Sequence, residues 1–144
     1  MAVTRKQPPR FPVAVPTAVP EIAVQAANEI RARIGPLDDV EVFHNMVLVA
    51  TYIRPEKTAG GIIRPEKTRD EDKWQGKAGL VLKVGSIAFV DDATTKFNGV
   101  RVHAGDWVVF NVNDGFAMDF NKVRCRLLQD VHIKMRVLNP DEVW

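Results

Sequence analysis

The sequence is poor in cysteine and lacks any long apolar run. Cys125 is the only cysteine among 144 residues, so no disulfide can form within one chain. No apolar segment approaches the roughly 20 residues of a membrane-spanning helix, and none follows the N-terminal basic residues as a secretion signal would. These absences predict a cytoplasmic protein with no membrane partner.

A large excess of one charge is also absent. The chain has 20 basic and 18 acidic residues, which leaves a net charge of +2 at pH 7. Nucleic-acid-binding domains usually carry a strongly basic patch, and so small a net charge gives little long-range attraction to phosphate. We therefore expect no nucleic-acid partner.

The usual signs of an enzyme or a metal site are missing as well. His44, His103 and His132 lie far apart, and none has a cysteine or histidine at a metal-binding spacing. No phosphate-binding glycine motif and no nucleophile-and-base pattern is found. Asp91 and Asp92 are adjacent acids, but such pairs in loops are usually solvated rather than catalytic. We predict no metal, no cofactor and no enzyme activity.

The N-terminal segment is rich in proline. Five prolines precede the first helical pattern, at positions 8, 9, 12, 16 and 20. Such a segment favours an extended arm that cannot build a core of its own. Its apolar residues, Phe11, Val13, Val15 and Val19, are candidate assembly contacts. A proline-ligand role for residues 9–12 is the alternative.

Residues 21–34 are predicted to form a short helix. Ile22, Ala26, Ile30 and Ile34 recur at every fourth position, and Gly35 follows them as a helix stop. The expected organisation has three parts. Residues 1–36 form the arm and the helix, residues 37–137 a β-barrel, and residues 138–144 a tail.

From residue 40 the pattern is typical of a mainly β protein. Short apolar runs with alternating periodicity predict seven strands, at residues 47–53, 79–84, 100–102, 106–112, 116–119, 123–128 and 131–137. Residues 113–115 are expected to turn a hairpin between the strands on either side. Asp91 to Gly99 is expected to project as a second hairpin, turning at Asn98-Gly99. Many short strands without helices between them favour a small barrel or a sandwich.

A repeated hexapeptide marks the longest predicted loop. Ile-Arg-Pro-Glu-Lys-Thr occurs at residues 53–58 and again at 63–68, around Ala59, Gly60, Gly61 and Ile62. Two glycines and two prolines disfavour regular structure there. The pair Ile62 and Ile63 is unusual in so charged a loop, which predicts a partner-binding site. The alternative is that the pair packs on its own core as the end of a strand.

The order of these features resembles the GroES-type co-chaperonins, the lids of the large bacterial chaperonin rings. Similar pieces occur at residues 44–49 for the first strand, 59–63 for the mobile loop, 79–85 for the following strand, 91–99 for the roof hairpin, and 102–110 for the strand after it. The resemblance implies a GroES-like barrel. It also implies a homo-oligomeric ring, usually a heptamer, whose mobile loops dock on a chaperonin.

The chain departs from that pattern in its loop and at its N-terminus. Arg64 stands where the family carries the third hydrophobic docking residue, and about forty residues precede the family's usual start. The site residues implied by the resemblance are therefore Ala59, Gly60, Gly61, Ile62, Ile63 and Arg64.

Two alternatives to the co-chaperonin function stay open. One is a structural virion protein, encoded by a bacteriophage, that decorates or connects a capsid and binds capsid proteins through its arm. The other is a relative of the barrel in zinc alcohol dehydrogenases, which the missing ligand cluster and the missing dinucleotide-binding domain oppose.

Overall fold

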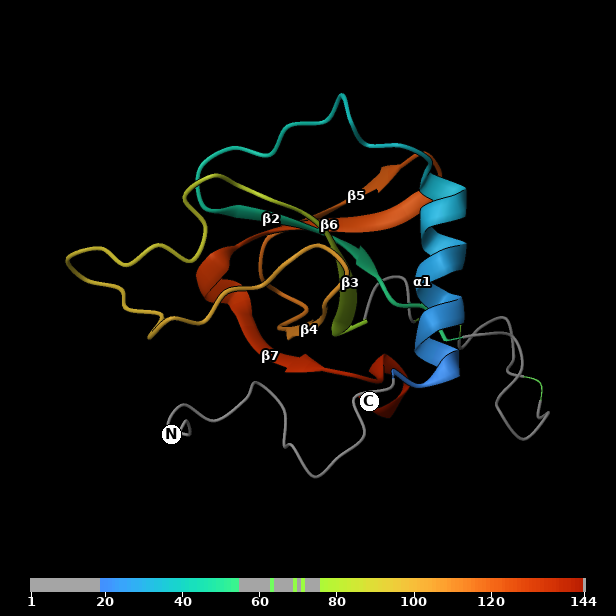
Figure 1. Ribbon diagram of the computed structural model, residues 1–144. Coiled ribbons are helices and arrows are strands. Elements are labelled where there is room, and N and C mark those ends of the chain that lie inside the picture. The colour runs from blue at the N-terminus through green and yellow to red at the C-terminus, as the bar shows by residue number, and fades with distance from the viewer. Residues whose placement is uncertain (1–18, 55–62, 64–68, 70, 72–75, 144) are drawn as a thin grey trace, which may run out of the picture.

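The computed structural model describes residues 19–54, 63, 69, 71 and 76–143. In this part of the chain the fold is mainly β, as predicted, with one α-helix and a six-stranded antiparallel sheet (Figure 1). The strands are β2 (Met46–Thr51), β3 (Ala78–Val84), β4 (Trp107–Phe110), β5 (Phe116–Phe120), β6 (Val123–Gln129) and β7 (Ile133–Val137). Their order across the sheet is β5-β6-β2-β3-β4-β7.

The sheet curls so that its two halves face each other. Figure 1 shows β5, β6 and β2 on one side of the fold, β4 and β7 on the other, and β3 between them. The enclosed core consists of Val47, Val49, Val81, Ala88, Phe89, Val102, Val108, Phe110 and Leu128. Side chains alternate along a strand, so the residues between these positions lie on the outer face of the sheet.

Helix α1 (Glu21–Ile34) covers part of that outer face and has the predicted bounds. Ala23 and Ala27 are buried against Leu80 and Trp107. Ile34 packs at the other end with Leu48, Ala50 and Cys125. Both faces of β2 are therefore buried, which accounts for its continuous apolar run.

The predicted hairpin between the strands around residues 113–115 is wrong. β4 pairs with β3 and β7, whereas the strand that β5 pairs with in the described part of the chain is β6. The turn itself is present, since Asp114 N–H donates to the Asn111 carbonyl at 3.0 Å and Gly115 has φ +66°. The hairpin lies one strand later, where Asn121 and Lys122 both have positive φ between β5 and β6.

The structure also corrects the strand predicted between β3 and β4. Residues 100–102 are not a strand, although Val102 is buried in the core. The predicted turn at Asn98-Gly99 is confirmed: both residues have positive φ, and Val100 N–H donates to the Phe97 carbonyl at 2.9 Å. This segment projects from the fold in Figure 1.

The C-terminal part of the chain starts its last strand later than predicted. The 3-10 helix η1 (Asp130–His132) precedes β7, and a second one, η2 (Pro140–Glu142), follows it. Pro140 is buried, and Val143 packs against the cluster under α1. The division of the chain at residues 36 and 137 stays a prediction.

Candidate functional site

The loop that carries the repeat connects β2 and β3. These strands are neighbours in the sheet, and their last registered pair is Thr51 with Gly79. Tyr52 N–H donates to the Ala78 carbonyl at 2.8 Å, one step beyond that pair. A Cβ at Gly79 would come within 2.9 Å of the Ala50 carbonyl oxygen, so glycine permits this close approach. The loop therefore starts from a tightly registered base.

Tyr52 anchors one limb of this base. The side chain is only 1% exposed, and its hydroxyl donates to Asp141 Oδ1 at 2.8 Å. Its ring meets Trp107 edge to face, with the ring centroids 5.5 Å apart. Such a buried aromatic pair with a satisfied hydroxyl holds its position well. The loop base is thus tied both to β4 and to the C-terminal turn η2.

A second contact joins the two limbs farther out. Arg69 Nε donates to the Arg54 carbonyl at 3.3 Å. The two residues are fifteen positions apart in the sequence, and the stretch between them contains the whole predicted docking segment. Closing the two ends of a loop lowers the number of conformations open to it.

Of the predicted loop site, the structure describes only Ile63. This side chain is 64% exposed and does not pack into the core. Ala59, Gly60, Gly61, Ile62 and Arg64 lie outside the described residues. Of the predicted arm contacts, Phe11, Val13 and Val15 also lie outside, whereas Val19 is described and 43% exposed.

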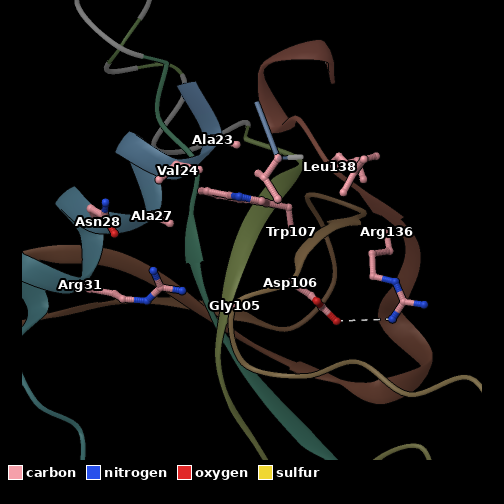
Figure 2. A pocket seen from close by; sticks show the side chains of 12 residues that line it. Ala23, Val24, Ala27, Asn28, Arg31, Gly105, Asp106, Trp107, Arg136 and Leu138 are labelled. Atoms are coloured by element: carbon pink, nitrogen blue, oxygen red, sulfur yellow. Dashed lines mark hydrogen bonds and ion pairs between the residues drawn. The ribbon is translucent and has the colours of Figure 1, made fainter. Parts of the chain in front are cut away.

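Val19 lines a groove that sequence reasoning missed. The groove has a volume of about 220 Å³ and lies between α1 and the strands β4 and β7 (Figure 2). Its apolar wall includes Val24, Ala27, Trp107 and Leu138. Val24 was the available signal, because it is an apolar residue that stands off the predicted apolar stripe of the helix.

The other end of the groove is polar. Asp106 and Arg136 form an ion pair at 3.4 Å, drawn as a dashed line in Figure 2, and Arg136 also donates to the Arg101 carbonyl at 2.7 Å. Arg31 reaches from α1 toward Gly105, where its Nη2 lies 3.3 Å from the site a Cβ would occupy. The groove thus combines apolar side chains with guanidinium donors.

Asp91 and Asp92 accept backbone hydrogen bonds within the projecting segment. Asp92 Oδ1 accepts from Thr94 N–H at 2.8 Å and from Thr95 N–H at 2.7 Å, and these hydrogen bonds lower the pKa of its carboxyl. Asp91 Oδ1 accepts from Phe97 N–H at 2.7 Å. Both acids therefore hold local backbone, which is the usual role of aspartate in turns.

The described residues contain neither a metal-binding cluster nor a membrane-spanning helix. Within residues 19–54 and 76–143, His, Cys, Asp and Glu nowhere form a group of three that could hold a metal ion. No helix among the described residues is long and apolar enough to cross a membrane.

Comparison with protein-family models identifies the family of the chain. No curated protein sequence matches the chain. The family model described as the chaperonin 10 Kd subunit matches residues 39–135, about two thirds of the chain. That range starts after α1 and runs through all but the end of β7, so it covers the curled sheet, the repeat-bearing loop and the projecting segment. The chain therefore belongs to the chaperonin 10 Kd subunit family, the family of the co-chaperonins.

Proposed function

We propose that this protein assembles into a ring, as the GroES resemblance implies, and caps a chaperonin to assist protein folding. The loop at residues 59–64 is the docking segment, with Ile62 and Ile63 as its apolar contacts. The observation that carries the proposal is the family match over residues 39–135, which includes this loop. The exposure of Ile63 and the anchored loop base support it.

The energetics favour a weak contact that is repeated around a ring. Burying one isoleucine side chain contributes about 1.5–3 kcal/mol, and part of this gain offsets the cost of ordering the loop. One loop with two isoleucines therefore binds weakly. Once one loop of a ring is docked, the others bind as intramolecular events at high effective concentration, so the ring as a whole binds tightly.

Exposed apolar side chains on the edge strands support self-association. Among the residues that the structure describes, β5 and β7 each pair on one side only. Phe116 on β5 is 56% exposed, and Met135 on β7 is 51% exposed. An open strand edge with large apolar side chains tends to pair with another chain unless something covers it.

The test is a loop variant measured against an assembled, nucleotide-loaded chaperonin ring. Ile62→Asp together with Ile63→Asp should reduce binding at least a hundredfold, because a carboxylate in an apolar groove is very unfavourable. The matched control, Thr58→Asp with Thr68→Asp, adds the same charges beside the docking segment and should bind nearly as wild type. Circular dichroism should show both variants folded. Unchanged binding by the isoleucine variant would refute the proposal.

The alternative of a virion shell protein has no observation in its favour among the described residues. Its separate test is co-purification from the native source. A capsid partner, with no chaperonin in the same fractions, would replace the co-chaperonin proposal.

A further inference from the structure

On its helical side, the groove between α1, β4 and β7 is formed by residues outside the range that the family model matches. The match begins at residue 39, whereas α1 ends at Ile34. The helix thus adds a wall to the outer face of the sheet, and Trp107 and Leu138 provide the opposite side (Figure 2). Val19 and Val24 on the helical side are each 43% exposed. The groove is therefore open to another polypeptide.

We propose that this groove binds residues 11–18 from a second copy of the chain. This segment, Phe-Pro-Val-Ala-Val-Pro-Thr-Ala, has no charged residue and is mostly apolar, which suits the apolar wall of the groove. The inference rests on the self-association part of the proposed function and not on chaperonin binding.

The size of the groove favours side chains of an extended segment over a small-molecule ligand. Pockets that enclose small molecules usually have volumes of about 300–1,000 Å³, whereas this groove has about 220 Å³ and is open. Valine and proline side chains at alternate positions of an extended strand would fill such a space without burying a charge.

Hydrogen-bonding chemistry points to the same occupant. Proline lacks a backbone N–H, so the segment, with prolines at positions 12 and 16, has more carbonyl acceptors than N–H donors, and an extended conformation leaves these carbonyls without internal partners. The groove offers donors at its polar end, namely the guanidinium of Arg31 and the side-chain amide of Asn28. Donors that face an acceptor-rich backbone are complementary to it.

The start of the helix favours a neighbouring copy over the same chain. Pro20 has φ −55° and ψ 143°, so the chain enters α1 in an extended conformation. To lie in its own groove, the preceding segment would have to reverse direction within the few residues between Pro16 and Val19. Proline restricts both its own φ and the residue before it, which disfavours so tight a reversal.

The length of the segment is sufficient to reach a neighbour. The docked stretch starts at residue 18, next to Val19, and the eight residues from Phe11 to Ala18 span up to about 28 Å when extended. A domain of this size has a radius of gyration of about 15 Å. The arm can therefore reach the groove of a neighbouring copy that lies beside the start of α1.

The test uses disulfide trapping between two full-length variants, Val15→Cys in one protein and Val24→Cys in the other. They are mixed, allowed to exchange subunits and treated with oxidised glutathione. We expect a covalent heterodimer. Gln25→Cys, one position along the exposed side of α1, should give at least tenfold less product in the same mixture. Cys125 is fully buried and contributes no background in the folded protein.

Each remaining outcome counts against the inference. A link that forms only within a chain carrying both Val15→Cys and Val24→Cys would place the arm in its own groove. Equal yields with Val24→Cys and Gln25→Cys would show random collision. The particle mass of wild type, measured by light scattering, separates the two proposals. A ring without specific cross-links refutes only the groove inference, whereas a monomer at all concentrations also refutes ring assembly.

Discussion

Asp130 is a buried carboxylate that joins three segments of the chain. It is 4% exposed, and its Oδ2 accepts from Phe89 N–H at 2.9 Å while its Oδ1 accepts from Asn45 Nδ2 at 3.2 Å. Phe89 has φ +64°, a conformation that is unfavourable for a residue with a side chain. The carboxylate therefore holds a strained residue at the start of the projecting segment.

Asp130→Ala should lower the free energy of unfolding by about 1–3 kcal/mol, because it leaves the Phe89 N–H without its buried acceptor. The measurement is urea unfolding followed by circular dichroism. Asp38→Ala, which removes an exposed carboxylate, is the control and should change stability by less than about 0.5 kcal/mol. Equal midpoints for the two variants would contradict this role of Asp130.

Cys125 is a buried residue whose titration the fold changes. Burial, followed by the negative charge of Asp119, raises the pKa of its thiol to about 11 from an ordinary value of 9.0. Because the pKa is higher in the folded state, the thiol's contribution to stability is complete below pH 9.0. The contribution is lost as the pH rises toward about 11.

The native protein should therefore react very slowly with a thiol reagent at pH 8. Labelling should become fast only when urea unfolds the chain, since the thiolate is the reactive form and the side chain is buried. The rate of release of the coloured product of Ellman's reagent measures this. Rapid labelling of the folded protein would show that α1 does not cover β6 as described.

At the scale of elements, α1 packs against the sheet and stabilises it. Ile34 is 2% exposed among Leu48, Ala50 and Cys125, and its carbonyl accepts from Asn121 Nδ2 at 2.7 Å. Ile34→Ala should lower the free energy of unfolding by about 2–4 kcal/mol through lost burial and a residual cavity. Val24→Ala, on the exposed side of the helix, should cost less than about 1 kcal/mol. Thermal and urea unfolding give both values. A loss of stability for Ile34→Ala as small as that for Val24→Ala would show that α1 is dispensable.

The elements with strong local signals were predicted well. The four-residue spacing and Gly35 gave the helix bounds, and apolar runs located β2, β3, β4, β5 and β6. The Asn98-Gly99 turn was also recognised from its residues, because asparagine and glycine are the residues that most readily adopt positive φ.

The errors arose where long-range packing decides the structure. Val102 is apolar and buried like a strand residue, but the chain around it fills the core without a pairing partner. Lys122 has positive φ in a two-residue hairpin turn, a conformation that a lysine does not signal. The pairing of β4 with β7 is a contact between distant parts of the chain, which local patterns do not specify.

The candidate site shows the same difference between features with local sequence signals and features that depend on long-range packing. The exposure expected for Ile63 agrees with the structure, because glycine, proline and charge around it mark a loop. The anchors of that loop were not predictable, since Tyr52, Trp107 and Asp141 meet only after β4 and η2 pack beside β2. The groove likewise forms from three separate elements.

At the scale of the whole molecule, Trp107 connects the two proposed binding regions. It lines the groove on one side and contacts Tyr52 at the loop base on the other. If the two proposals hold, self-association through the arm and docking through the loop act on one packed cluster. A ring would present several loops together, which compensates for the charged residue Arg64 within each docking segment.

The most direct test of the central claim is a titration of an assembled chaperonin with this protein, read by inhibition of the chaperonin ATPase in the presence of nucleotide. Wild type should inhibit. Arg64→Leu should inhibit at a concentration about five- to thirtyfold lower, because an apolar side chain in the docking groove contributes about 1–2 kcal/mol more. If neither protein inhibits or binds the ring, even in large excess over it, the proposed co-chaperonin activity of this chain is wrong.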